Sequence, residues 1–197
     1  MRLIGLTGGM GSGKTTVAKM FQDLKVPVYN SDTEAKRLMN EDAGLRPAII
    51  KLFGDQAYKD DTLNRGFLAE KAFADKALLS KLNNIVHPAV RKDFKSWAKR
   101  QQVPYVIQEA AILFENDGYK GFDQMILITA PKKIRIGRIR KRDGLTEKAI
   151  LERMQHQWPE KKKKELAHYV INNKNLEDTR KQVLKIHNRI LQKSLET

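Results

Sequence analysis

The amino-acid sequence predicts an α/β protein whose core is a five-stranded parallel sheet flanked by helices. Two observations carry this prediction. Short apolar runs rich in Val, Ile and Leu alternate with helical patterns along the 197 residues, which is typical of a parallel sheet covered on both faces. The first run also leads directly into a glycine-rich loop and then a helix, an order found in proteins that bind phosphate groups.

The elements follow one another in a regular order. Five segments have the length and composition of buried strands, at residues 3–7, 27–30, 104–107, 124–129 and 169–172. The clearest helical patterns are at residues 14–25, 131–142 and 175–193. Because the carboxyl ends of parallel strands meet at one edge of a sheet, we expect ligands to bind beyond that edge.

The stretch between the second and third strands, residues 33–100, is mostly helical in pattern and forms an insertion in the alternating plan. We expect its first helix to be capped by Ser31 or Asp32, since Ser31 followed three residues later by Glu34 is typical of a capping box. The helical pattern is expected to break at Gly44, Pro47, Gly54, Gly66 and Pro88.

The glycine-rich loop has a complete phosphate-binding pattern. Residues 8–15 read GGMGSGKT and match G-x-x-x-x-G-K-S/T. Glycines allow the backbone N–H groups to converge on an anion, and the helix that follows directs its positive end at the same place. Lys14 can reach the β- and γ-phosphates, and the Thr15 hydroxyl can ligate Mg²⁺. The loop therefore predicts a nucleoside triphosphate and Mg²⁺.

Polar residues follow the predicted strands at the same edge of the sheet. Asp32 comes after the second strand, Glu109 after the third, and Asn172 and Asn173 after the fifth. A carboxylate facing a phosphate loop can hold Mg²⁺, directly or through water, or accept a proton from an attacking hydroxyl. Each carboxylate also has an ordinary structural explanation, as a helix cap for Asp32 and as a strand-end carboxylate for Glu109.

The net charge of +15 is unevenly distributed. Residues 132–142 (KKIRIGRIRKR) contain no acidic side chain, and a helix would place Arg135, Arg138 and Arg142 on one side. Arginine suits bidentate contact with phosphate, so we expect this face to serve a phosphate ligand. The segment lacks the interleaved aromatic residues of a single-strand binding surface, so we expect no nucleic-acid partner. The lysine run at 161–164 is expected to be a solvated helix face.

Other classes of protein are disfavoured by composition. The sequence contains no cysteine, which excludes a disulfide framework and a thiolate metal site. It has no pattern of a signal peptide at its start and no apolar run approaching 18 residues. We expect a cytoplasmic protein with no membrane contact, present as a monomer or a weak homo-oligomer.

The residues also match a known family. The chain resembles dephospho-coenzyme A kinase, which has a P-loop kinase fold. The resemblance extends from end to end of the chain and includes the doubled glycine of the loop. Its most distinctive part is His87-Pro88 with Arg91 shortly after. The remaining matches are Asp32 after the second strand, Leu63-Asn64-Arg65, the acid at Glu109, Arg138, the run Arg142-Asp143-Gly144-Leu145, and Val170-Ile171-Asn172-Asn173.

The resemblance implies an ATP-dependent kinase that phosphorylates the 3′-hydroxyl of the ribose of dephospho-CoA, giving CoA and ADP. It implies catalytic roles for Lys14, for Asp32 as general base, and for Arg138. The implied nucleotide-binding residues are Gly9, Gly11, Ser12, Gly13, Lys14, Thr15, Thr16, Arg142 and Asn173, with Thr15 on Mg²⁺. The implied acceptor-binding residues are Thr7, Asp32, Arg65, His87, Arg91 and Glu109.

The resemblance also implies a division into parts. Residues 1–31, 101–134 and 159–197 would form the nucleotide-binding core, residues 32–100 the domain that binds dephospho-CoA, and residues 135–158 a lid. Some positions depart from the family pattern. Glu109 stands where the family has Asp, Ala111 where it has Pro, Arg135 where it often has Gln, and His168 where it has Asp.

Three rival functions are distinguishable from the sequence. A GTP switch needs an N-K-x-D motif, and Leu176 stands where the Asp would be in Asn173-Lys174-Asn175-Leu176. A nucleic-acid-dependent ATPase would need the aromatic residues that the basic segment lacks. The remaining alternative is another small-molecule kinase of the nucleoside monophosphate or shikimate type. Such an enzyme would share the loop and the lid but gives no reason for the segment around His87.

Overall fold

The computed structural model describes residues 1–195, and the chain divides into two compact units. One unit comprises Met1–Tyr29 together with Gln101–Thr197 and contains the sheet. The other comprises Asn30–Arg100 and is largely helical. We call them the sheet unit and the helical unit. None of the helices within residues 1–195 is long and apolar enough to cross a lipid bilayer.

The five-stranded sheet confirms the predicted fold class. Its strands are β1 (Arg2–Gly8), β2 (Val28–Asn30), β5 (Tyr105–Glu109), β6 (Gln124–Thr129) and β7 (Tyr169–Asn172). They lie in the order β2-β5-β1-β6-β7, and the pairs β1–β5, β1–β6 and β6–β7 are parallel. The strand that leads into the phosphate loop is therefore the central one. Residue Ile4 of this strand is in register with Ile107 on one side and Gln124 on the other.

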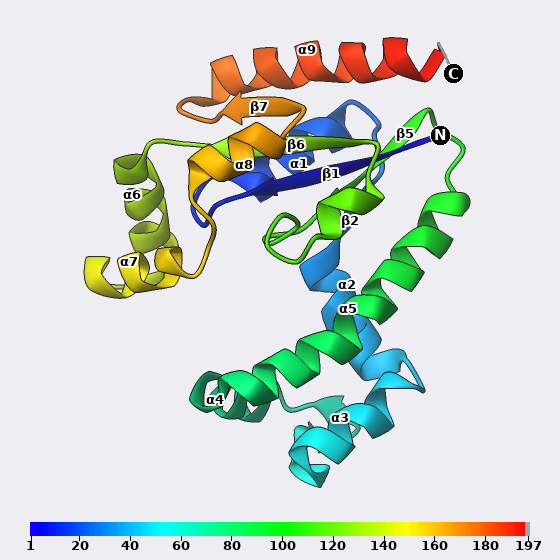
Figure 1. Cartoon of the computed structure of the whole chain (residues 1–197), viewed down its shortest axis with the longest axis vertical. Helices are drawn as coiled ribbons and strands as arrows, with labels where there is room; N and C mark the ends of the chain where they lie inside the picture. Colours follow the sequence, from blue (N-terminus) through cyan, green and yellow to red (C-terminus); the bar gives the residue numbers. More distant parts are fainter. Residues whose placement is uncertain (196–197) are drawn as a thin grey trace. The chain divides into compact units, whose positions relative to one another are not determined.

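Helices cover both faces of the sheet. On one face lie α1 (Lys14–Asp23) and α9 (Leu176–Leu195), and on the other lies α8 (Glu160–Leu166), as Figure 1 shows. Two further helices, α6 (Lys132–Asp143) and α7 (Glu147–Gln155), connect β6 to α8, and a short 3-10 helix, η2 (Gly118–Gly121), precedes β6. The predicted helices at 14–25, 131–142 and 175–193 thus agree with α1, α6 and α9 to within two residues.

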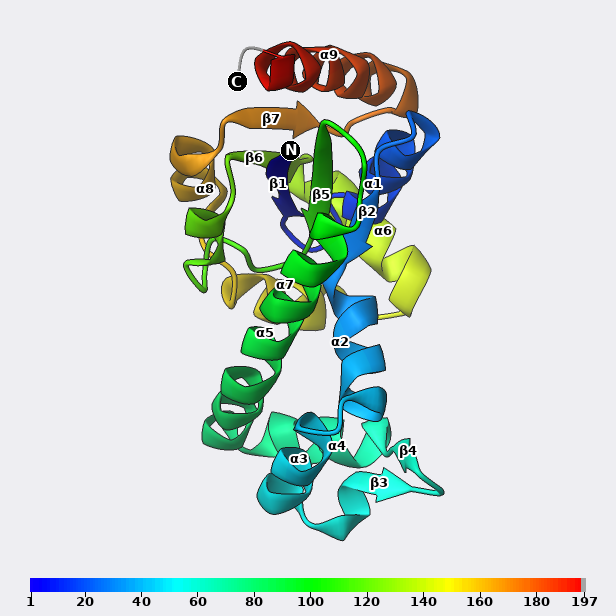
Figure 2. The same ribbon diagram turned by 90° about the vertical axis from the view of Figure 1, so that its right-hand side faces the viewer.

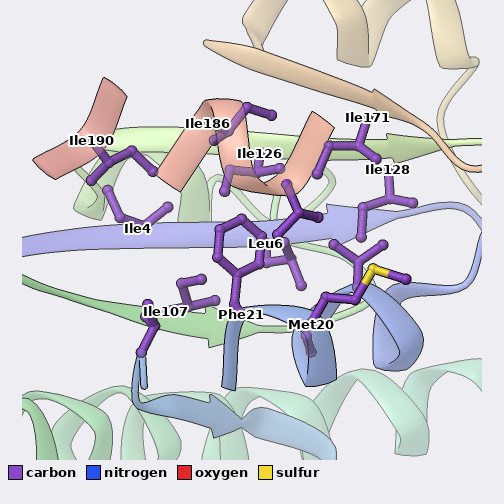
Figure 3. Close-up of a cluster of buried hydrophobic side chains, with 14 of the residues drawn as sticks. Ile4, Leu6, Met20, Phe21, Ile107, Ile126, Ile128, Ile171, Ile186 and Ile190 are labelled. Atoms are coloured by element: carbon purple, nitrogen blue, oxygen red, sulfur yellow. The ribbon is translucent and has the colours of Figure 1, made fainter. Parts of the chain in front are cut away.

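Alternation along the strands divides the buried side chains between two cores. The larger core, between the sheet and the pair α1 and α9, is shown in Figure 3 and includes Phe21 and Ile126, both fully buried. The smaller core contains Met125 and Leu127 from the opposite face of β6, packed with Phe114. Because both faces are buried, a shift of register by one residue would exchange the two sets of side chains, so each strand is firmly positioned.

The helical unit contains α2 (Ser31–Glu41), α3 (Leu45–Phe53), α4 (Arg65–Ala74) and the long α5 (Lys76–Lys99). Figure 2 shows α2 and α5 running along each other, with the other elements gathered near the carboxyl end of α2 and the amino end of α5. Those elements include a 3-10 turn, η1 (Asp55–Ala57), and a hairpin of β3 (Tyr58–Lys59) and β4 (Thr62–Leu63) that the sequence analysis did not predict.

Three of the expected helix breaks are wrong. Pro47 and Gly66 lie in the first turns of α3 and α4, where the N–H that proline lacks has no helical partner in any case. Pro88 lies inside α5, which continues through it. The interior proline costs about 3 kcal/mol, and burial of Val86, Val90 and Phe94 on one side of the helix offsets that cost.

The expected cap of α2 is also displaced by one residue. The helix already begins at Ser31, and the side chain of Asn30 accepts the hydrogen bond from the Thr33 N–H at 2.9 Å. Asn30 caps the helix because it is the last extended residue of β2, and the carboxylates of Asp32 and Glu34 fall in the first turn. Asp32 is exposed and is not needed as the cap.

Candidate active site

The phosphate loop depends on two glycines with positive φ. Gly11 has a φ of +77° and Gly13 a φ of +91°, a region that other residues rarely adopt. Gly13 is also the residue before α1, and a Cβ atom there would come within 2.2 Å of the Asn173 side-chain nitrogen. The loop therefore requires glycine at position 13 for its backbone conformation and for space.

The residues at the start of α1 lie where the sequence motif predicts. The ammonium group of Lys14 donates to the carbonyl oxygen of Gly8 at 3.1 Å, so the lysine side chain folds back across the loop. The hydroxyl of Thr15 donates to a carboxylate oxygen of Glu109 at 3.4 Å. Thr16 follows in the same first turn, and Glu109 is 6% exposed at the end of β5.

The carbonyl oxygen of Ser12 accepts hydrogen bonds from a predicted nucleotide-binding residue, Asn173, and from a predicted catalytic residue, Arg138. It accepts a hydrogen bond of 2.8 Å from the side-chain amide of Asn173 and one of 3.3 Å from the guanidinium of Arg138. Arg138 also donates to the Asn173 carbonyl oxygen at 3.0 Å. Behind Asn173, the Thr179 hydroxyl donates to its side-chain oxygen at 3.1 Å and fixes the orientation of the amide.

Two contacts to Met10 hold the other side of the loop. The Arg135 Nε donates to the Met10 carbonyl oxygen at 2.8 Å, and the Met10 N–H donates to the side-chain oxygen of Gln157 at 2.9 Å. The Arg135 guanidinium packs against Gly9, where a Cβ would come within 2.4 Å of it. Burial lowers the pKa of Arg135, and Glu160 partly opposes that effect. The sequence analysis did not assign Gln157 to the site.

Arg142 differs from the expectation that the three arginines of α6 act on one side. Its guanidinium is bound to the neighbouring Asp143 at 2.7 Å, and its side chain is 67% exposed. The structure thus brings Arg135 and Arg138 to the loop but places Arg142 in a surface ion pair. The reason is local, because Asp143 lies next to Arg142 at the end of the helix.

Thr7, which the resemblance implies to be an acceptor-binding residue, is fully buried at the end of β1. Its hydroxyl has no hydrogen-bond partner within the part of the chain that the structure describes. The hydroxyl of Ser12 is buried in the same way, whereas the backbone carbonyl oxygen of Ser12 accepts two hydrogen bonds. A ligand or a water molecule at the base of the loop would supply the hydrogen-bond partners that these two hydroxyls lack.

The helical unit carries the other candidate residues. Asp32 is exposed in the first turn of α2, two residues after the end of β2. His87 and Arg91 lie one turn apart on α5. Burial, reinforced by the nearby positive charge of Arg91, lowers the pKa of His87. Arg65 is the first residue of α4 and lines an apolar pocket of about 350 Å³ together with Lys36, Leu68 and Leu79.

Within residues 1–195, no group of three or more His, Cys, Asp or Glu side chains is arranged to hold a metal ion. The oxygen atoms of Thr15 and Glu109 are nevertheless ligands of the kind that Mg²⁺ prefers. In phosphoryl-transfer sites this ion is usually held by one or two protein oxygens and by the substrate phosphates. The oxygen ligands that are present fit such a site.

The comparison with known families decides the class of kinase. The family model for dephospho-CoA kinase matches residues 2–178. The chain belongs to the dephospho-CoA kinase family. Like the other members, it is a kinase that transfers phosphate to a hydroxyl group. The resemblance inferred from the loop, Asp32 and the segment around His87 is therefore confirmed.

Individual relatives agree with the family assignment. A dephospho-CoA kinase of Salinibacter ruber is 41% identical over 177 residues, which is 88% of this chain and 89% of the relative. A crystal structure from Thermus thermophilus superimposes with a TM-score of 0.86 at 31% identity and covers 96% of this chain and 97% of that one. The dephospho-CoA kinase of Campylobacter jejuni, with a TM-score of 0.70 and 24% identity, covers 96% of this chain and 97% of its own, and it supports the fold.

Proposed function

We propose that the enzyme transfers the γ-phosphoryl group of ATP to the ribose 3′-hydroxyl of dephospho-CoA and releases CoA and ADP, the last step in making coenzyme A. The observation that carries this proposal is the phosphate loop held by Arg138 and Asn173 in a chain of this family. The alternative of a nucleoside monophosphate or shikimate kinase is not favoured, because the named relatives are dephospho-CoA kinases.

The sheet unit would bind the donor. The N–H groups of the loop, including those of Gly9, Gly11, Ser12 and Gly13, and the amino end of α1 would surround the ATP phosphates. Lys14 would leave the Gly8 carbonyl for the β- and γ-phosphates, while Thr16 extends the first turn. Arg138, already beside Ser12, would stabilise charge on the transferring group, and Asn173 and Arg142 would lie on the adenine side.

Mg²⁺ would be held by the Thr15 hydroxyl, with Glu109 accepting a hydrogen bond from a water ligand or binding directly. When bound, the ion would offset the charge of the β- and γ-phosphates. Glu109 then has a second contribution, because its present hydrogen bond fixes the Thr15 side chain in position for the metal. Removal of Mg²⁺ by a chelator is expected to abolish turnover.

Asp32 would act on the acceptor. A ribose hydroxyl is a weak nucleophile at pH 7, and a carboxylate can orient it and accept its proton late in a loose transition state. The residue suits this role because it is exposed and is not used as the cap of α2. Asp32 follows β2 in the chain, at the edge of the sheet where the ligands of parallel α/β proteins bind.

The helical unit would hold dephospho-CoA through Arg65, His87 and Arg91, with Thr7 contributing from the sheet unit. The pocket beside Arg65 is lined mainly by apolar side chains, and its lining also includes the two cations Arg65 and Lys36. That combination suits a pantetheine arm next to a pyrophosphate. A lowered pKa keeps His87 neutral at pH 7, so it would serve as a hydrogen-bonding group rather than as a cation.

The parts of the molecule would then work as a two-substrate enzyme in the cytoplasm. Residues 1–31, 101–134 and 159–197 would form the donor core, residues 32–100 would bind the acceptor, and residues 135–158 would close as a lid that excludes water. We expect a monomer or weak homo-oligomer that needs neither nucleic acid nor a membrane for activity.

The deciding experiment measures ADP formation with ATP and Mg²⁺ in the presence of dephospho-CoA, AMP, shikimate or no acceptor. We expect a rate well above the blank with dephospho-CoA alone. A rate with dephospho-CoA no greater than the blank would refute the proposal. A greater rate with AMP or shikimate would instead support the other class of small-molecule kinase.

A further inference from the structure

A second pocket, of about 630 Å³, lies on the α8 side of the sheet unit next to the start of the phosphate loop. Its walls come from the carboxyl end of β6, the first turn of α6, the turn between α7 and α8, and α8 itself. Figure 1 shows these elements following one another along the chain at one end of the sheet. Neither Arg138 nor Asn173 lines it, so this pocket is separate from their contacts with Ser12.

The lining of the pocket has a net positive charge. Its lining includes four basic side chains and one carboxylate, that of Glu160. The basic residues are Lys132, Arg135, Lys163 and Lys164. Lys163 is paired with Glu115 at 2.5 Å and Lys164 with Glu160 at 2.8 Å, so the uncompensated charge of the lining comes mainly from Lys132 and Arg135. The four basic residues come from two helices, α6 and α8, that are separate in sequence, so the cluster does not result from a single run of lysines. A pocket with this lining favours an anionic ligand.

The positive charge of Arg135 is only weakly compensated. The Arg135 side chain is 15% exposed, and Glu160 lies 3.9 Å away, at the outer limit of an ion pair. The Nε of Arg135 donates to the Met10 carbonyl oxygen, which leaves the two terminal nitrogens of the Arg135 guanidinium for other partners. Burial lowers the pKa of Arg135 because it removes water that would otherwise solvate the charge. An anion would replace that lost solvation.

The backbone adds further donors at the same place. Helix α6 begins after Pro131, which gives no side-chain cap, and its first turn contains no acidic residue. The unsatisfied N–H groups and the positive end of a 12-residue helix therefore face the region lined by Pro131 and Lys132. This arrangement supplements the cationic side chains of the pocket and is typical of sites for phosphate.

One wall of the pocket is apolar. Leu127, Met154 and Trp158 line it, and Trp158 packs against the smaller core of the sheet. The Lys162 ammonium lies 3.3 Å from the centroid of the Trp158 ring. A ligand that fills the volume would therefore combine a phosphate group with a less polar portion, and its size matches that of common small-molecule sites.

We propose that this pocket is a regulatory site for a small phosphate-bearing molecule, bound at the same time as ATP. The inference goes beyond the proposed catalytic function and does not depend on the identity of the acceptor. The ligand would bind Arg135 and Lys132, together with Lys164 once its ion pair with Glu160 opens, and its less polar portion would lie against Trp158.

Arg135 couples the pocket to the phosphate loop. The same guanidinium that lines the pocket packs on Gly9 and holds the Met10 carbonyl oxygen at 2.8 Å. Gln157, which also lines the pocket, accepts the hydrogen bond from the Met10 N–H. A ligand that repositions Arg135 or Gln157 changes at least one of the two hydrogen bonds to Met10, so it alters the affinity of the loop for ATP. By linkage, ATP must alter the affinity for that ligand by the same factor.

The test uses inorganic pyrophosphate as the probe and Trp158 as the reporter. Because Trp97 is the other tryptophan of the chain, a Trp97→Phe protein reports from Trp158 alone. The phosphate loop is first filled with a saturating non-hydrolysable ATP analogue and Mg²⁺. Pyrophosphate is then titrated into this complex, and into complexes carrying Lys132→Ala with Lys164→Ala. The matched control carries Lys133→Ala with Lys161→Ala, which removes the same charge from exposed positions outside the pocket.

We expect a saturable change in fluorescence, with the dissociation constant raised about tenfold or more in the pocket variant and nearly unchanged in the control. Absence of binding once the loop is filled would overturn the proposal, as would competition between pyrophosphate and the ATP analogue. Equal weakening in both double variants would also overturn it, since general charge would then explain the binding. Coupling is measured by repeating an ATP-analogue titration with and without pyrophosphate, and an unchanged ATP affinity would refute the regulatory role.

Discussion

The side-chain amide of Asn173 donates a hydrogen bond of 2.8 Å to the carbonyl oxygen of Ser12, a residue 161 positions earlier in the chain. The end of the last strand thus determines the shape of a loop that follows the first strand. Arg138 donates to the same carbonyl oxygen and to the Asn173 backbone, so three segments far apart in sequence meet at one atom.

Replacing Asn173 by Asp should weaken ATP binding. The new carboxylate has no N–H to donate and would face the Ser12 carbonyl oxygen, so two acceptors would repel each other. We expect the KM for ATP to rise about tenfold, as measured by steady-state kinetics. Asn172→Asp is the control, because it adds the same charge at an exposed side chain one residue away. A similar rise in both variants would show that charge, and not the hydrogen bond, was responsible.

Replacing Asp32 by Asn should reduce kcat by roughly 100-fold or more while ATP binding stays close to normal. The amide keeps the shape of the side chain but cannot accept the proton of the ribose hydroxyl. Turnover with dephospho-CoA and binding of an ATP analogue are measured in parallel. Glu34→Gln neutralises the other carboxylate of the same helical turn and serves as the control. Unchanged turnover in Asp32→Asn would remove this residue from catalysis.

Arg138→Ala should reduce phosphoryl transfer by about 100-fold or more, because it removes a donor for the charge on the transferring group. Arg138→Lys should restore little of that loss, since lysine cannot contact both Ser12 and Asn173 with a planar group. Arg142→Ala is expected to have a smaller effect, because the Arg142 side chain is 67% exposed. Single-turnover kinetics would measure the rate of phosphoryl transfer in each variant. Equal losses in Arg138→Ala and Arg142→Ala would contradict the different roles expected for the two arginines.

The ion pair between Lys163 and Glu115 should be important for stability. The side chains of Lys163 and Glu115 are only 3% and 12% exposed, and the Glu115 carboxylate also accepts a hydrogen bond from the backbone N–H of Trp158. Glu115→Ala leaves a buried cation, so we expect a loss of about 3 kcal/mol or more in the free energy of unfolding, measured with urea. The exposed pair of Lys181 and Glu177 provides the comparison. Glu177→Ala should cost less than about 1 kcal/mol.

Stability should decrease in mild acid because of two half-buried histidines, His87 and His187. Burial lowers the pKa of both His87 and His187, so the unfolded chain takes up protons at a higher pH than the folded one. The stabilising effect is therefore complete above the ordinary histidine pKa and is lost as the pH falls through the lowered values. His87→Gln should reduce the pH dependence of urea unfolding between about pH 7 and 5, a range set by the ordinary value near 6.5. An unchanged profile would exclude His87 as a contributor.

The strand pattern and the phosphate motif were sufficient to predict the sheet, because both depend on local sequence. Other features depend on distant partners. Gln157 meets Met10 across 147 residues, and nothing next to Gln157 in the sequence indicates that contact. The hairpin at β3 and β4 was missed because its turn uses Asp60 and Asp61, both with positive φ, in place of the glycine that usually identifies such a turn. The expected break at Pro88 is absent because the packing of α5 outweighs the local cost of the proline.

The central position of β1 has a consequence for how the enzyme is made in the cell. This strand is synthesised before its neighbours β5 and β6, which span Tyr105–Glu109 and Gln124–Thr129, so it stays unpaired until those residues have been synthesised. The helical unit is continuous in sequence and can fold earlier, as units generally do during synthesis. The nascent chain therefore completes its helical unit before the phosphate loop has its flanking strands, and the apolar strand β1 needs protection from aggregation during that interval.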